Sequence, residues 1–199
     1  MSIPAPGVCS LTGMSDNRSE VSERYRRIAD GFTARVEGVP SEHWSARTPC
    51  SEWNVRDLVA HVVGTHWRVG AALDQRDPVE VDPNGDLLRQ WRDARAAIVA
   101  ALDDEGRAST VVSGMFGDQP FVSLVGRLLC ADTLVHTWDL ARATGQDERL
   151  DPDGVARAIE FLTPIDEPMR GPRGFAPKIT PPAGADEQTK LLNFCGRAP

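Results

Sequence analysis

The chain has 199 residues, of which 41% are hydrophobic and 26% are charged, a composition typical of a globular protein with a sizeable core. Its formal net charge is -7, from 22 basic and 29 acidic residues, and this balance argues against a nucleic-acid groove, which needs a clustered basic surface. No apolar run approaches the roughly 20 residues of a membrane-spanning helix, so we expect neither a nucleic-acid partner nor a membrane.

The N-terminal residues indicate where the ordered part of the chain begins, and the cysteines indicate its cellular compartment. Residues 1–17 are aperiodic and carry Pro, Gly and Ser, without the basic start and apolar core of a secretory signal, so they predict a disordered extension. The folded part is then a single domain over residues 18–199. The cysteines are too scattered for a disulfide framework and predict reduced thiols in a cytoplasmic protein: Cys9, Cys50, Cys130 and Cys195.

Apolar residues at helical spacing predict three helices in the first half of the chain, over 18–36, 55–73 and 86–102. Gly38 and Pro40 end the first helix. Asn54 is a suitable N-cap for the second, because its side chain can accept a hydrogen bond from a free amide of the first turn. The connections at 41–53 and 74–85 are expected to be loops.

The second half predicts three more helices. Residues 105–119 are expected to be extended, as a short strand or hairpin. Pro120 suits the first turn of a helix, because its missing N–H is unused there, and this fourth long helix ends at Gly145. Shorter helices follow over 153–163 and 186–195.

Residues 164–184 carry six prolines and form either an ordered, lid-like wrap or a flexible tether. Four long amphipathic helices joined by short or moderate connections predict an all-α fold, a helical bundle to which the Pro-rich wrap and a C-terminal helix are added. Such bundles bind metals and ligands between facing helices.

Asp132 and His136 are anomalous in the fourth long helix. Its buried face follows the i, i+3, i+4, i+7 pattern, but these two positions carry polar side chains. A buried carboxylate needs a partner, and residues four apart are neighbours on a helix surface. The pair is either a structural Asp–His hydrogen bond or two of the three protein ligands of a metal site.

A third ligand would have to come from another helix. His61 is the best candidate, because it lies beside the apolar stripe of the second helix; the alternative is a core-edge histidine with a satisfied N–H. Asp139, nearly one turn after His136, is either the acceptor for the outer N–H of that imidazole or a salt-bridged acid.

Three blocks of the chain resemble a known family. Residues 48–64, TPCSEWNVRDLVAHVVG, are similar to the TPCxxWxVRDLxxHLVG block of the DinB/YfiT-like metalloprotein superfamily. Residues 132–143, DTLVHTWDLARA, are similar to its fourth-helix block, and residues 185–192, ADEQTKLL, to a closing ADxQTRLL segment. More narrowly, the chain resembles actinobacterial metal-binding proteins related to the N-terminal domain of mycothiol-dependent maleylpyruvate isomerase.

This resemblance implies a DinB-like four-helix bundle of up-down-down-up order with a metal at one end of its central cleft. The family's ligands correspond to His61, Asp132 and His136, with Asp132 in place of the Glu of the characterised isomerase. Two imidazoles and a carboxylate suit zinc best, and also nickel or iron. Enzymes of the family use the metal with a low-molecular-weight thiol such as mycothiol.

The resulting hypothesis is a metal-dependent transferase or isomerase that uses mycothiol on a small electrophilic substrate. One alternative is a non-catalytic, stress-associated module in which the metal clamps the fold. Another is an enzyme of a biosynthetic pathway that uses the metal as a Lewis acid without a thiol. The Pro-rich stretch could also support a homodimer.

Three further side chains are candidates for the surroundings of the metal. Cys50 precedes a helix N-terminus, where the pKa of a thiol can be lowered, or it is a small buried side chain that fixes the loop. Trp53 and Trp138 either line a pocket or belong to the core.

Overall fold

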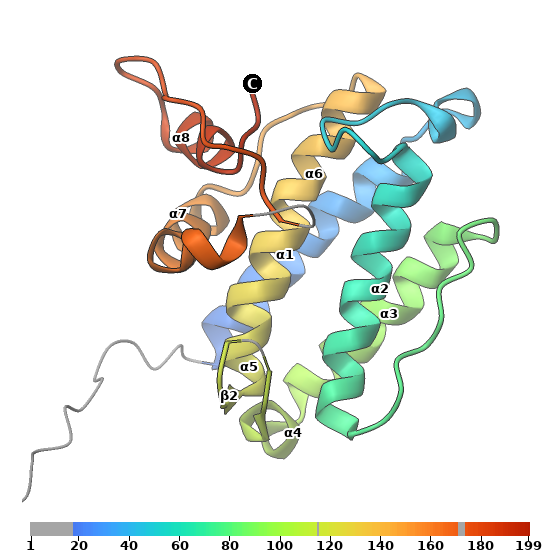
Figure 1. Cartoon of the computed structure of the whole chain (residues 1–199). Coiled ribbons are helices and arrows are strands. Elements are labelled where there is room, and N and C mark those ends of the chain that lie inside the picture. Colours follow the sequence, from blue (N-terminus) through green and yellow to red (C-terminus); the bar gives the residue numbers. More distant parts are fainter. Residues whose placement is uncertain (1–17, 115, 171–173) are drawn as a thin grey trace, which may run out of the picture.

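The computed structural model describes residues 18–114, 116–170 and 174–199 (Figure 1). The predicted disordered extension lies outside these residues. The predicted all-α class is confirmed, because the described regular structure is helical apart from one two-stranded hairpin. In chain order the elements are α1 (Arg18–Glu37), η1 (Ser41–Ser45), α2 (Val55–Asp74), α3 (Leu87–Asp103), α4 (Glu105–Ser109), β1 (Val111–Val112), β2 (Gln119–Pro120), α5 (Phe121–Leu124), η2 (Val125–Leu129), α6 (Cys130–Thr144), α7 (Pro152–Leu162), η3 (Thr163–Ile165), η4 (Glu167–Met169) and α8 (Glu187–Phe194).

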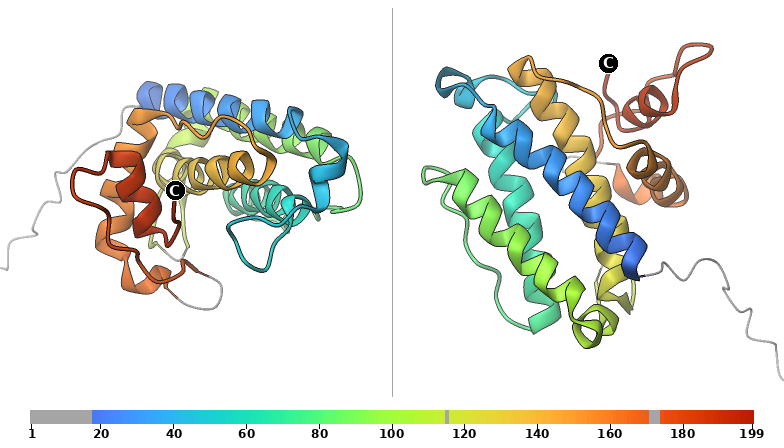
Figure 2. Two further views of the ribbon diagram at one scale, coloured as in Figure 1. Left: turned by 90° about the horizontal axis from the view of Figure 1, so that it is seen from above. Right: turned by 180° about the vertical axis from the view of Figure 1, so that it is seen from behind.

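The four long helices α1, α2, α3 and α6 pack side by side around a common core (Figures 1 and 2). Helix α1 contacts α3 and α6, and α2 contacts the same two helices. In Figure 1, α1 and α6 run upward while α2 and α3 run downward, and the connection at 75–86 returns the chain between α2 and α3. Helix α7 packs against α6, and α8 packs against α7. None of the described helices is long and apolar enough to cross a bilayer.

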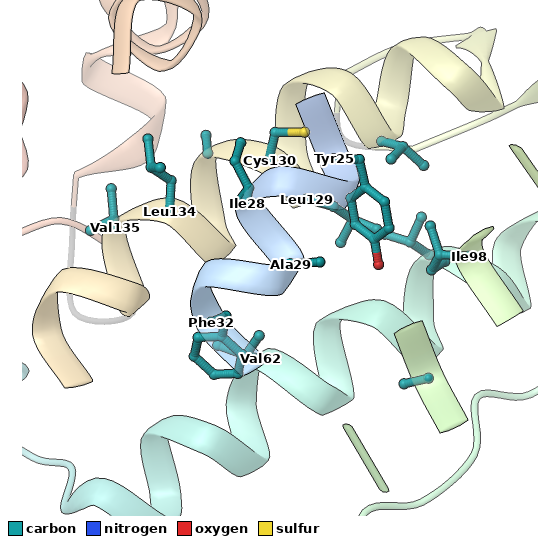
Figure 3. Packing of buried hydrophobic residues seen from close by; sticks show 14 of the residues in the cluster. Tyr25, Ile28, Ala29, Phe32, Val62, Ile98, Leu129, Cys130, Leu134 and Val135 are labelled. Atoms are coloured by element: carbon teal, nitrogen blue, oxygen red, sulfur yellow. The ribbon is translucent and has the colours of Figure 1, made fainter. Parts of the chain in front are cut away.

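The core is built from the apolar faces that the helical spacing predicted. Figure 3 shows Tyr25 and Phe32 from α1, Val62 from α2, Ile98 from α3 and Leu129 from η2 in this cluster. All five are almost completely buried. Burying a large apolar side chain contributes about 1.5–3 kcal/mol, so this shared core fixes α2 relative to α6.

Local caps set the ends of the helices that carry the polar cluster. Asn54 accepts a hydrogen bond from the amide of Asp57, and the Asp57 carboxylate accepts one from the amide of Asn54, which makes a reciprocal capping box at the start of α2. Gly145 ends α6 in the left-handed conformation, with φ 69°. Both predicted signals are confirmed.

Two predicted segments need correction. Residues 105–119 were expected to be extended, but they begin with the short helix α4, because Asp104 accepts a hydrogen bond from the amide of Arg107 and caps one turn. The predicted hairpin then follows as β1 and β2. The loop at 41–53 likewise contains a 3₁₀ turn, η1.

The fourth long helix also differs from the uninterrupted α-helix that was expected. The segment after its first turn, η2, is a π-helical turn, which adds a residue to the usual repeat one turn before Asp132. Gly126 in this turn lies against α1, where an added Cβ would come within 3.1 Å of the Val21 side chain. A side chain at this position would therefore require the Val21 side chain to move by a few tenths of an ångström.

The described part of the Pro-rich stretch is fixed to α8, which favours the ordered-wrap alternative over a tether. The amide of Ile179 donates to the carbonyl of Asn193, and the guanidinium of Arg170 donates to the carbonyl of Phe194. Gly196 follows α8 with φ 79°, and an added Cβ there would lie 2.7 Å from the Cβ of Ala176. This turn directs Arg197 back toward α6.

Candidate metal centre

Three potential metal ligands from two helices meet at the seam between α2 and α6. The Nε2 atom of His61 lies 3.2 Å from Oδ1 of Asp132. The Nε2 atom of His136 lies 3.6 Å from the same oxygen. One ligand atom of each side chain lies within 4.8 Å of the other two. The structure thus brings together the three residues that were predicted as ligands, while their binding of a metal stays a prediction.

The helical spacing explains why these groups meet. Asp132 and His136 are one turn apart on α6 and point to the same side. His61 faces them from α2, which packs directly against α6. Its imidazole lies across from that of His136, with ring centroids 5.0 Å apart.

Asp139 orients the imidazole of His136. Its Oδ2 atom lies 3.0 Å from Nδ1 of His136. An ionised carboxylate can only accept, so Nδ1 carries the proton and donates it, and Nε2 faces Asp132 and His61. This contact is the one expected of an outer partner that orients a metal-binding histidine.

Arg197 completes this network from the C-terminal segment. Its Nε donates to Oδ1 of Asp139 at 3.1 Å, and its Nη2 donates to Oδ2 at 2.8 Å. The side chain of Asp139 is completely buried and that of Arg197 is 9% exposed. A bidentate pair of this kind is the geometry in which a buried carboxylate is satisfied. Sequence reasoning did not identify Arg197.

The charges of this cluster shift the pKa values of its members. Burial favours neutral His136, but the neighbouring carboxylates of Asp132 and Asp139 outweigh burial and raise the pKa of His136 to about 10. Burial would raise the pKa of Asp132, yet the two imidazoles beside it, His136 above all, lower it. The pKa of Asp139 lies well below its ordinary value, because the hydrogen bond from His136 and the charge of Arg197 outweigh burial.

The metal-free protein is therefore expected to lose stability as the pH rises above neutrality. The folded pKa of His136, about 10, lies above the ordinary histidine pKa of 6.5. The stabilisation from its protonated form is complete below the unfolded pKa and is lost as the pH rises through the folded one. Urea unfolding with a chelator at about pH 6 and about pH 9 should show this fall. The free energy of unfolding of a His136→Gln variant should fall less between the two pH values. An equal fall in the two proteins would contradict the assignment of this pH dependence to His136.

The residues present fit a divalent metal. Oδ2 of Asp132 is buried and has no hydrogen-bond partner, the situation of an atom that lacks its ligand. Two imidazoles and one carboxylate form a donor set typical of catalytic zinc. The side chains of His61 and Asp132 are 28% and 17% exposed, so the cluster is partly open to solvent.

The family sequence model of the mycothiol maleylpyruvate isomerase N-terminal domain matches residues 25–141 of this chain. The chain belongs to this family. Two uncharacterized proteins of Mycobacterium tuberculosis, one from strain CDC 1551 and one from strain H37Rv, are each 33% identical to it over 176 residues, which cover 87% of this chain and 95% of theirs. No solved structure matches the chain significantly.

The segment matched to the mycothiol maleylpyruvate isomerase N-terminal domain includes His61, Asp132, His136 and Asp139. It ends before Arg197, which reaches the cluster from 58 residues beyond Asp139. The signal that pointed to such a partner was Asp139 itself, since a carboxylate on a buried face requires a cation or donors.

The aromatic candidates lie in different places within this family domain. The ring of Trp53 lies 4.5 Å from that of His61 and 5.7 Å from that of His136, so it covers one side of the cluster. Trp138 follows His136 by two positions and points to another side of α6. There it donates to Glu148 and is covered by Arg142, which supports the core alternative for Trp138.

Cys50 lies on the Nδ1 side of His136, next to Asp139. Its Sγ atom is 3.4 Å from Oδ2 of Asp139 and 3.3 Å from Nη2 of Arg197. The thiol of Cys50 is partly buried, and the described cysteines form no disulfide: Cys50, Cys130 and Cys195.

Proposed function

We propose that this chain binds a divalent metal through His61, Asp132 and His136 and is a transferase or isomerase that uses a low-molecular-weight thiol, such as mycothiol, on a small electrophile. The observation that carries the proposal is Oδ2 of Asp132, a buried oxygen without a partner on the carboxylate whose Oδ1 lies beside the two imidazoles. Zinc is the metal that this donor set favours most, and nickel and iron also suit it.

The residues around the cluster have separate roles in this proposal. When bound, a divalent cation would supply the positive charge that favours the thiolate form of a thiol at neutral pH. Asp139 keeps the proton of His136 on Nδ1. Trp53 lies against the two imidazoles and shields that side of the cluster from water.

The incomplete ligand set and the partial exposure of the cluster support an enzyme over a fold clamp. A closed structural site has four protein ligands and excludes solvent, whereas this cluster offers three and is partly open. A hollow of about 130 Å³ lies farther along the same side, between α2 and the hairpin loop, and is lined by Val69, Leu124 and Leu128. Arg68 at its edge is about 10 Å along α2 from His61.

The test combines metal content with thiol chemistry. The purified protein is stripped with a chelator, reloaded with Zn²⁺ and incubated with mycothiol and either maleylpyruvate or an epoxide. We expect consumption of the thiol or isomerisation only with the reloaded protein. A protein that binds Zn²⁺ tightly but neither binds mycothiol nor changes any electrophile would overturn the thiol-dependent function. A large rise in the melting temperature on reloading would then identify the metal as a fold clamp.

A further inference from the structure

His136 lies between two sets of potential metal ligands. On its Nε2 side are His61 and Asp132, and on its Nδ1 side are Cys50 and Asp139. In the second set, as in the first, one ligand atom of each residue lies within 4.8 Å of the others. A thiolate, an imidazole and a carboxylate form a strong zinc site, so the second set is a competitor for the metal.

The guanidinium of Arg197 already lies against the donor atoms of two members of this second set, Cys50 and Asp139. It makes two hydrogen bonds to the carboxylate of Asp139 and a third contact to Sγ of Cys50. Its remaining terminal nitrogen donates to the carbonyl of Cys195, which ties it to the end of α8. The second set is therefore filled by a cation that belongs to the chain.

A metal at the second set would have to displace this cation. It would also need the lone pair of Nδ1 of His136, which instead carries the proton donated to Asp139. A guanidinium stays charged at every physiological pH, so the positive charge at this set is not lost by deprotonation of Arg197.

We propose that Arg197 is a positioning residue that closes the Cys50, His136 and Asp139 donor set and directs a divalent metal to the Nε2 side of His136. This inference rests on the proposed binding of a metal by His61, Asp132 and His136. It adds a specificity device supplied by the C-terminal segment, which lies outside the part of the chain matched to the family.

Cobalt(II) distinguishes the two sets, because a cobalt–thiolate bond gives an intense charge-transfer band in the near ultraviolet that nitrogen and oxygen ligands do not. The reduced, metal-free protein is titrated with Co²⁺ alone. We expect the wild type to bind Co²⁺ without the thiolate band. Arg197→Met should bind Co²⁺ with the band, and its affinity at the first set should fall about 10–100-fold because Asp139 is no longer held against His136.

Three further variants identify the source of the band. Arg197→Met/Cys50→Ser should lose it, which excludes the buried thiols Cys130 and Cys195 as its origin. Arg197→Lys keeps the charge but not the planar fork, and its band should be weaker than that of Arg197→Met. Cys50→Ser in the wild type should leave the Co²⁺ spectrum and affinity unchanged, and this variant tests the proposal even if Arg197→Met does not fold.

The outcomes separate this inference from the proposed function. A wild type that takes up no Co²⁺ would overturn both. A wild type that binds Co²⁺ with a thiolate band would overturn the role of Arg197 alone, as would an Arg197→Met protein with native helix content and the wild-type spectrum. A loss of Co²⁺ affinity in Cys50→Ser would also overturn it, because Cys50 would then be a ligand.

Discussion

Replacing His136 with alanine is expected to remove the metal from the purified protein. The substitution deletes the imidazole that stands beside Asp132 and leaves two potential ligands, His61 and Asp132. Loss of an outer partner of a ligand already costs about 10–100-fold in metal affinity, so loss of the ligand itself should cost more than about 100-fold. Elemental analysis of the purified variant and competition titration with a chromophoric chelator give the stoichiometry and the affinity. Thiol consumption should be lost in parallel.

His43→Ala is the matched control, because it removes an imidazole from η1 that belongs to neither potential ligand set. It should keep the wild-type metal content. His61→Ala should lose metal as His136→Ala does. If His61→Ala bound metal normally while His136→Ala did not, His61 would be the core-edge histidine of the alternative interpretation.

The sequence predicted the helices because their signals are local. Asn54 caps α2 through a residue three positions away, and Gly145 ends α6 through its own backbone freedom. Predicting that His61 lies next to Asp132 and His136 required more than the helical periodicity of the sequence. His61 was the best candidate because it lies beside the apolar stripe of α2, and the family resemblance then assigned all three ligands, whereas the spacing alone favoured a structural Asp–His pair over a metal site.

Other features depend on tertiary contacts that leave no periodic signal. The π-helical turn before Asp132 contains Gly126, which lies close to Val21, 105 residues away in the chain. Arg197 lies beyond the last helix and meets Cys50 across 147 positions. Only the burial of Asp139 could have indicated that a cation was required there.

Asp139→Leu is expected to destabilise the protein by about 3–5 kcal/mol, because it leaves the buried guanidinium of Arg197 without its counter-charge. It also removes the acceptor of the N–H of His136. Urea unfolding of the metal-free protein at neutral pH measures this cost. Because the folded pKa of Asp139 is depressed, the contribution of its charge is complete above the unfolded pKa and decreases as the pH falls below about 4.

Asp147→Leu is the control for this prediction, since Asp147 also binds an arginine, Arg149, through charged hydrogen bonds, but on the exposed surface. Solvent screens such a pair, so its loss should leave the free energy of unfolding nearly unchanged. Asp139→Leu/Arg197→Met removes both buried charges and should be more stable than Asp139→Leu alone, with a coupling energy of about 1–3 kcal/mol. If the two substitutions were additive, the pair would not interact in solution, and Arg197 could not hold Asp139 against His136.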